Sequence, residues 1–161
     1  MGPLLAALLG VEFAETDSLI AQRAGKPVGD IFVDDGEDAF RDLERSAAVE
    51  AITGHRGVLA LGSGSILSQD TRDLLAGQRV VYLETAFPAV VRRTGLDGPH
   101  PPIPGNPRGR LRQLLDERRP LYQDVAWLTV TTDDRDAQQV AGEIAAAIAG
   151  GRAAGGGEPR S

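Results

Sequence analysis

Two carboxylate residues, Glu15 and Asp17, stand two positions apart where a short, mostly apolar run (residues 11–14) meets a helix-like segment (residues 18–24). In α/β proteins, ligands collect at the carboxyl ends of strands. Paired carboxylates at such a point suit the binding of a metal ion or of sugar-like hydroxyl groups. The alternative is a helix cap, in which Thr16 or Asp17 accepts hydrogen bonds from backbone N–H groups.

A second candidate group is the glycine loop, Gly62-Ser63-Gly64, which follows an apolar run at residues 58–61. Glycine lets a ligand approach the backbone closely and leaves N–H groups available to it. The same composition is also typical of an ordinary turn, so the loop alone is a weak signal.

Arginines supply the third group. Arg41 precedes Glu44 by one helical turn, a spacing that fits either a solvated salt bridge or a positioned clamp for a carboxylate. Arg118 and Arg119 end a basic segment. The arginines at 108, 110 and 112 are more typical of a solvated helix face than of a nucleic-acid patch.

Alternating strands and helices must position these groups. Continuous apolar runs predict buried parallel strands, and apolar residues at helical spacing predict helices between them. The class predicted is therefore α/β, a parallel sheet with helices on both faces. The predicted strands lie at 11–14, 58–61, 80–83 and 127–130, and the predicted helices at 3–9, 18–24, 37–52, 71–75, 88–93, 108–118 and 136–148.

Composition narrows the possible functions. The chain has 161 residues, a formal net charge of −6, no cysteine and two histidines. The negative charge argues against general affinity for nucleic acid or anionic membranes. Without cysteine there is no disulfide framework, and His55 and His100 are too far apart for a histidine zinc site. No run approaches the roughly 20 apolar residues of a membrane span, so we expect a cytoplasmic protein.

The motifs in this order resemble the shikimate kinase family, from about residue 4 to about residue 148. The family has a D-T-D motif, a D-I-F motif, an F-R segment with a following glutamate, a G-G-G loop, an R-R-T-G segment and an R-x-P-L-Y segment. The matching residues here are Glu15-Thr16-Asp17, Asp30-Ile31-Phe32, Phe40-Arg41 with Glu44, Gly62-Ser63-Gly64, Arg92-Arg93-Thr94-Gly95 and Arg118-Arg119-Pro120-Leu121-Tyr122.

The resemblance implies an α/β, parallel-sheet P-loop kinase fold of the three-layer, nucleoside-monophosphate-kinase-like type. It implies a shikimate-kinase-like domain over residues 1–149, with a substrate-binding part at about 15–65 and a lid at about 95–107. Residues 150–161, rich in glycine, proline and arginine, are expected to be a disordered tail. The implied reaction is ATP-dependent phosphorylation of the shikimate 3-hydroxyl, in chorismate and aromatic amino-acid biosynthesis, with Mg²⁺ as the metal.

The resemblance also implies roles for single residues. Asp17 would hold the acceptor hydroxyl and act catalytically, while Arg41 and Arg118 would clamp the shikimate carboxylate. The remaining implied contacts are with shikimate for Phe32, Phe40, Gly62, Ser63 and Gly64, with the nucleotide for Arg93 and His100, and with the metal through water for Glu15. The only partners implied are the two small-molecule substrates, without nucleic acid or membrane, and a monomer is expected.

Two departures from the family stand out. The 161 residues contain no G-x-x-x-x-G-K-[ST] motif, and the lid carries His100-Pro101 where the family usually has Arg-Pro. One hypothesis is that Met1 is a misassigned start within a longer, complete kinase, which translation of the upstream DNA would test. The competing hypothesis is a P-loop-less pseudokinase that binds shikimate-like ligands. A third possibility is a related gluconate-type kinase.

Overall fold

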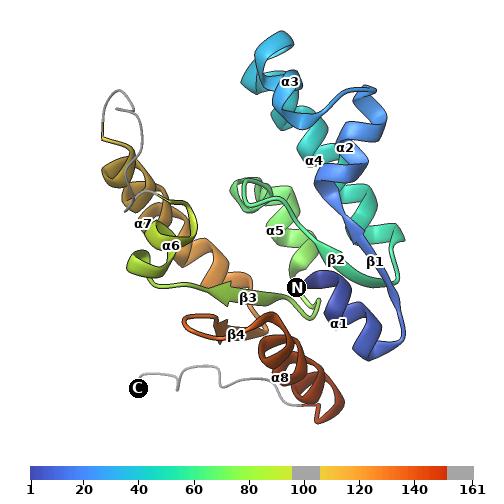
Figure 1. Ribbon diagram of the computed structural model, residues 1–161. Helices are drawn as coiled ribbons and strands as arrows, with labels where there is room; N and C mark the ends of the chain where they lie inside the picture. The colour runs from blue at the N-terminus through green and yellow to red at the C-terminus, as the bar shows by residue number, and fades with distance from the viewer. Residues whose placement is uncertain (96–105, 152–161) are drawn as a thin grey trace, which may run out of the picture. The chain divides into compact units, whose positions relative to one another are not determined.

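The computed structural model describes residues 1–95 and 106–151 of the chain. Helices alternate with short parallel strands, which confirms the predicted α/β class (Figure 1). Two compact units follow one another along the chain, Met1–Gln78 and Arg79–Ser161, called the first and second units below.

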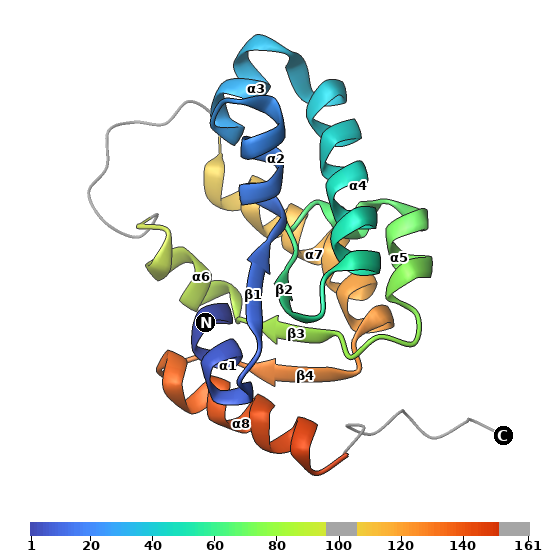
Figure 2. The same ribbon diagram turned by 90° about the vertical axis from the view of Figure 1, so that its right-hand side faces the viewer.

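The first unit contains a two-stranded parallel sheet in which Glu15 lies opposite Ala60 at the carboxyl ends of both strands. Helix α2 begins directly after β1 (Figure 2). Residues that follow the two strands are thereby brought to one edge of the sheet. The elements of this unit are α1 (Gly2–Leu9), β1 (Glu12–Glu15), α2 (Thr16–Ala24), α3 (Val28–Asp34), α4 (Gly36–Gly54), β2 (Gly57–Ala60), the 3₁₀ turn η1 (Ser65–Leu67) and α5 (Gln69–Leu75).

Local sequence explains where two of these helices begin or end. Gly10 ends α1 in the left-handed conformation, with φ of 65°, as expected of a glycine C-cap. Ser68 caps α5 by accepting a hydrogen bond from the Thr71 N–H.

An apolar core holds α2, α3 and α4 together. It consists of Ile20, Ile31, Phe40 and Ala47, which are at most 5% exposed. Phe40 and Ala47 stand seven positions, or two helical turns, apart on α4, which is the helical periodicity visible in the sequence.

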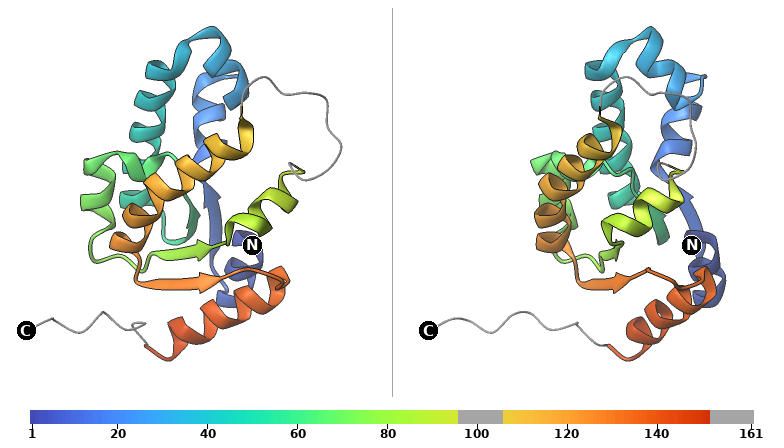
Figure 3. Two further views of the ribbon diagram at one scale, coloured as in Figure 1. Left: turned by 90° about the vertical axis from the view of Figure 1, so that its left-hand side faces the viewer. Right: turned by 60° about the vertical axis from the view of Figure 1, so that its left-hand side comes forward.

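The second unit contains the other parallel pair, β3 and β4, with Glu84 opposite Thr131 at the carboxyl ends. Figure 3 shows the two strands side by side with their arrowheads at the same end. Along β4, Leu128 and Val130 are buried while their neighbours are exposed, the alternation expected of a strand with one covered face. The elements are β3 (Val81–Glu84), α6 (Phe87–Arg93), α7 (Pro107–Val125), β4 (Leu128–Thr131) and α8 (Ala137–Ala149).

One predicted boundary is wrong. The basic helix was expected to end at residue 118, before Pro120, but α7 continues through Pro120 to Val125. Proline removes one backbone hydrogen bond from a helix interior, which disfavours it there. In this helix the last turn is packed by tertiary contact, since the Tyr122 ring stacks on Tyr82 of β3 with centroids 5.1 Å apart.

Most of the predicted lid, residues 96–105, and most of the predicted tail, residues 152–161, lie outside the described residues. Among the residues that are described, no helix has both the length and the apolar character that a membrane crossing requires.

Candidate active site

The junction of β1 and α2 places the two predicted carboxylates differently. Glu15 is the last residue of β1, and Asp17 lies in the first turn of α2; both are exposed, while Thr16 between them is fully buried. The N-cap position of α2 is Glu15, and no side-chain hydrogen bond caps this helix. The helix-cap interpretation of this motif is therefore wrong.

Thr16 instead contacts the glycine loop. Its hydroxyl oxygen accepts a hydrogen bond from the Gly62 N–H at 2.8 Å and lies 3.5 Å from the Ala60 carbonyl oxygen, to which it donates. The Gly62 N–H is thus already bound within the protein. This corrects the expectation that the loop leaves this N–H available to a ligand.

The glycine loop approaches the acidic side chains closely. A Cβ atom on Gly62 would lie 2.9 Å from Asp17 Oδ1 and 3.1 Å from Glu44 Oε1. A Cβ atom on Gly64 would lie 2.9 Å from both carboxylate oxygens of Glu44 and would overlap the guanidinium of Arg41. A side chain at either position would displace these charged side-chain ends, whereas Ser63 between them is exposed.

Arg41 and Glu44 form an ion pair on α4, with Arg41 Nη1 2.7 Å from Glu44 Oε2. The Glu44 side chain is only 6% exposed and that of Arg41 is 34% exposed, so the solvated-pair alternative is wrong. The second guanidinium nitrogen of Arg41 bonds to Glu37 Oε1 at 3.3 Å. Burial acts to lower the pKa of Arg41, but the hydrogen bonds and charges of Glu44 and Glu37 outweigh it and raise that pKa.

The two phenylalanines predicted to line the substrate pocket contact each other, with ring centroids 4.2 Å apart. Phe40 is 5% exposed and belongs to the helical core, and Phe32 is 39% exposed. The guanidinium carbon of Arg41 lies 5.4 Å from the Phe40 ring centroid. Phe40 therefore supports Arg41, and of the two rings it is Phe32 that is open to a ligand.

A cavity of about 420 Å³ borders this cluster and lies between α4 and the η1–α5 segment. Arg41, Glu44 and Gly64 form the part of its wall that belongs to the cluster. Its size falls within the range typical of small-molecule sites, about 300–1,000 Å³.

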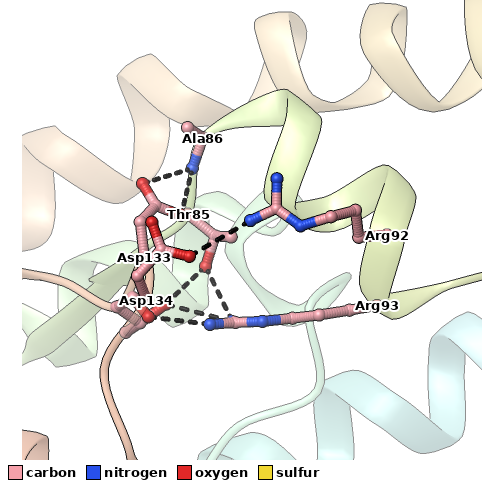
Figure 4. A network of polar contacts seen from close by, with 7 residues as sticks. Thr85, Ala86, Arg92, Arg93, Asp133 and Asp134 are labelled. Atoms are coloured by element: carbon pink, nitrogen blue, oxygen red, sulfur yellow. Dashed lines mark hydrogen bonds and ion pairs between the residues drawn. The ribbon is translucent and has the colours of Figure 1, made fainter.

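In the second unit, the carboxyl ends of β3 and β4 carry a separate polar network (Figure 4). The Thr85 and Thr132 hydroxyls lie 2.7 Å apart. Arg93, from the end of α6, donates to the Thr132 carbonyl oxygen at 2.7 Å and to the Thr132 hydroxyl at 3.1 Å. The edge of its guanidinium is thereby fixed, although the residue as a whole is exposed.

Two aspartates after β4 complete that network. The Asp133 carboxylate accepts the Ala86 N–H at 3.1 Å, and Asp134 pairs with Arg92 at 3.3 Å (Figure 4). Together these contacts tie the segment after β4 to the start and end of α6.

Arg118 is half-buried on α7 of the second unit. Its neighbour Arg119 lies 3.9 Å from Glu84 of β3, measured between Nε and Oε1. Arg41 and Arg118 belong to different units, so their joint contact with one carboxylate stays a prediction. His100 lies outside the described residues.

The residues present give little support for a protein-built metal site. Across residues 1–95 and 106–151, no three histidine or carboxylate side chains gather where they could hold a metal ion. Mg²⁺ in phosphoryl-transfer enzymes typically uses one or two carboxylates together with waters and substrate phosphates. Exposed Glu15 fits only such a water-mediated contact.

Comparison with known proteins identifies the family. The shikimate kinase family model matches residues 1–149. The shikimate kinase of Thermobifida fusca is 52% identical over 145 residues, covering 90% of this chain and 84% of that protein. The chain belongs to the shikimate kinase family.

Other relatives agree with this assignment. The shikimate kinase of Salinispora arenicola is 49% identical and covers 92% of this chain and 89% of that protein. The solved structure of Acinetobacter baumannii shikimate kinase in complex with shikimate has a TM-score of 0.79 at 36% identity, covering 94% of this chain and 86% of that one. The family and the P-loop kinase fold expected from the motifs are both confirmed.

In this shikimate kinase family member, the structure brings together four of the predicted substrate residues, Asp17, Arg41, Gly62 and Gly64. It adds the burial of Glu44 and the contact of Thr16 with the glycine loop, neither of which was predicted. The spacing of Arg41 and Glu44 suggested a pair, but nothing in the sequence showed that Glu44 is buried. Thr16 had one signal, a β-branched hydroxyl residue between two carboxylates at the end of a strand.

Proposed function

We propose that this chain phosphorylates the 3-hydroxyl of shikimate with ATP. The observation that carries the proposal is the cluster formed by Asp17, the Arg41–Glu44 pair and the glycine loop. The cluster offers a carboxylate for a hydroxyl group and a guanidinium for a carboxylate, which are the two kinds of polar group on shikimate. The named relatives support the same substrate.

The proposed step is a phosphoryl transfer in which Asp17 receives a proton. The 3-hydroxyl oxygen forms a bond to the γ-phosphorus of ATP, and the bond from that phosphorus to the β–γ bridging oxygen breaks. ADP leaves with the electron pair, and the hydroxyl proton passes to the Asp17 carboxylate. Asp17 is exposed, so a ligand hydroxyl can reach it. Catalysis of this kind depends mostly on positioning and on charge neutralisation.

Arg41 is the proposed anchor for the shikimate carboxylate, with Arg118 as the second arginine. A guanidinium binds a carboxylate through two parallel N–H groups, which fixes orientation as well as charge. Glu44 holds Arg41 in place through one of its terminal nitrogens. Phe32, Ser63 and Gly64 complete the proposed contacts with shikimate, and Gly62 contributes only by allowing the close approach of the loop to Asp17. Phe40 acts by contacting Arg41.

The second unit supplies the proposed nucleotide contacts. Arg93 would stack on adenine, since its edge is bonded to Thr132 and this leaves the face of the guanidinium for a ring. His100 would lie near the phosphates. Mg²⁺ would supply charge neutralisation on the phosphates, with Glu15 as a contact through water.

One alternative has an observation in its favour. The 161 residues contain no G-x-x-x-x-G-K-[ST] motif, the loop that cradles phosphates in P-loop kinases. A chain that binds shikimate without phosphorylating it would also need the acceptor cluster.

The test is release of ADP in a coupled assay with shikimate, ATP and Mg²⁺. Asp17→Asn should lower turnover by at least about 100-fold, as loss of a positioned base does. Asp38→Asn, an exposed aspartate in the first turn of α4, is the matched control and should leave turnover unchanged. Turnover with gluconate in place of shikimate would overturn the substrate assignment. Shikimate binding without any turnover would establish the alternative.

A further inference from the structure

We propose that Thr16 is the positioning residue of the acceptor site, holding the glycine loop against Asp17 through its hydroxyl group. The inference rests on the proposed function for its catalytic consequence, but not for its structural part. It concerns the middle residue of the Glu15-Thr16-Asp17 motif, whose two flanking carboxylates carry the roles implied by the family.

The Thr16 hydroxyl connects two elements that the sheet itself no longer joins. The parallel pairing of β1 with β2 ends at Glu15 and Ala60. Thr16 is the first residue after β1, and Gly62 is the second residue after β2. The Thr16 hydroxyl oxygen accepts a hydrogen bond from the Gly62 N–H at 2.8 Å. The same hydroxyl donates to the Ala60 carbonyl oxygen at 3.5 Å. A side chain thus extends the cross-strand connection beyond the last backbone pair.

Burial makes this connection energetically significant. Thr16 is 0% exposed and its hydrogen bond with the Gly62 N–H is partly buried, so the hydroxyl itself is shielded from water. Without the hydroxyl, the Gly62 N–H loses its partner, and the glycine loop would have to move or admit a water to supply a new one. Gly62 and Asp17 are close neighbours, since a Cβ on Gly62 would stand 2.9 Å from Asp17 Oδ1. A movement of the loop would therefore change the surroundings of the Asp17 carboxylate.

The β-branched side chain adds rigidity to this arrangement. Threonine has few allowed χ1 rotamers, so a buried Thr16 presents its hydroxyl in one direction. Asp17 follows immediately on the first turn of α2. Thr16 therefore helps to fix both the position of the Asp17 carboxylate and the position of the glycine loop.

The chain offers a matched set of variants. Thr16→Val keeps the shape and removes the hydroxyl, and Thr16→Ser keeps the hydroxyl and removes the methyl group. Thr71→Val is the control, because Thr71 is equally buried but its hydroxyl has no hydrogen-bond partner among the residues that the structure describes. Removing an unpartnered buried hydroxyl is expected to be neutral or mildly stabilising.

Two readouts separate the structural part from the catalytic part. Amide hydrogen exchange at Gly62 reports the Thr16 hydrogen bond directly, with the His55 amide, which bonds the Ala51 carbonyl oxygen at 2.9 Å, as a reference in the same unit. The Michaelis constants for shikimate and ATP report the consequence for the acceptor site. A general loss of fold would change both constants and both amides.

We expect Thr16→Val to speed exchange at Gly62 by about tenfold and to raise the shikimate KM by about tenfold, with the ATP KM unchanged. Thr16→Ser should stay within about threefold of the wild type in both readouts, and Thr71→Val should change neither. Wild-type protection at Gly62 retained in a folded Thr16→Val would overturn the proposal.

Two further outcomes are decisive. If Thr16→Val does not fold, unprotected Gly62 in the wild-type protein would still overturn the proposal, and protection there together with rescue by Thr16→Ser would support it. If the wild-type protein does not bind shikimate, the proposed function fails, while exchange at Gly62 still tests the hydrogen bond to Thr16.

Discussion

Gly62 and Asp17 approach each other so closely that a methyl group on Gly62 would stand 2.9 Å from Oδ1 of Asp17. The relationship links a loop after β2 to the first turn of α2. It favours glycine at position 62, the second residue after β2. A side chain added at Gly62 would therefore have to push the Asp17 carboxylate aside.

Gly62→Ala should therefore displace Asp17 and weaken shikimate binding. The exposed Asp17 carboxylate can move aside at little cost in stability, so we expect the effect in affinity, as a loss of about five- to tenfold. Calorimetric titration with shikimate measures the change. Gly54→Ala is the control, since a Cβ there meets nothing within 4 Å and the backbone is helical. Wild-type affinity in a folded Gly62→Ala protein would show that the close approach is unimportant.

Glu44→Gln should loosen Arg41 and raise the KM for shikimate. Hydrogen bonds to charged groups contribute about 1.5–3 kcal/mol, and because Arg41 is 34% exposed we expect the lower end of that range. The matched control is Glu37→Gln, which removes the exposed partner of the same guanidinium at 3.3 Å. We expect at most about a threefold effect from the control, as for most surface ion pairs. Equal effects of the two variants would contradict a special role for the buried carboxylate.

These predictions depend on features that the sequence could not supply. The order of strands and helices was predictable because continuous apolar runs mark parallel strands and because a glycine such as Gly10 commonly ends a helix. The expected full burial of the strands is wrong for β1, β2 and β3, none of which contains a buried residue. The burial of Glu44 depends on how closely the glycine loop packs on α4, and that distance is a tertiary property. The same holds for Thr16, whose partner lies 46 positions along the chain.

The end of α7 shows the same limit from the other direction. Pro120 predicts a helix boundary by local rules, yet the helix runs to Val125. Stacking of Tyr122 on Tyr82 packs the last turn and outweighs the local preference. The contacts proposed for Arg118 and His100 remain predictions.

Tyr82 should make stability sensitive to alkaline pH. Burial, and then the negative charge of Glu84, raise the pKa of Tyr82 above its ordinary value, and Arg119 opposes this without cancelling it. The folded state therefore binds the phenolic proton more tightly than the unfolded state. The resulting stability is fully present below the unfolded pKa, about 10, and is lost as the pH rises through the folded pKa.

Denaturant unfolding from about pH 8 to about pH 11 measures this dependence. Tyr82→Phe should remove part of the alkaline loss in the free energy of unfolding. Both proteins should carry Lys26→Arg, because the hydrogen bonds that Lys26 donates to Asp35 and Asp34 raise the pKa of Lys26 and would add a loss of the same sign. Superimposable pH profiles with and without Tyr82 would contradict the prediction.

Arg93→Lys should weaken ATP binding and leave shikimate binding intact. Lysine cannot reproduce the two contacts of Arg93 with Thr132, at 2.7 and 3.1 Å, and it lacks a planar face for adenine. We expect the KM for ATP to rise by about tenfold. Arg92→Lys is the control, since Arg92 pairs with the 87%-exposed side chain of Asp134 and its replacement should have little effect. A larger change in the shikimate KM than in the ATP KM would show that Arg93 contacts shikimate and not the nucleotide.

The most direct test of the acceptor site is calorimetric titration of shikimate into the wild-type chain and into Arg41→Ala, without nucleotide. The cluster of Asp17, Arg41, Glu44 and the glycine loop lies within the first unit. The measurement therefore tests the acceptor site without requiring ATP to bind. We predict saturable binding by the wild type and at least about a tenfold loss of affinity in Arg41→Ala. Equal affinity of the two proteins would contradict the assignment of Arg41 as the carboxylate anchor.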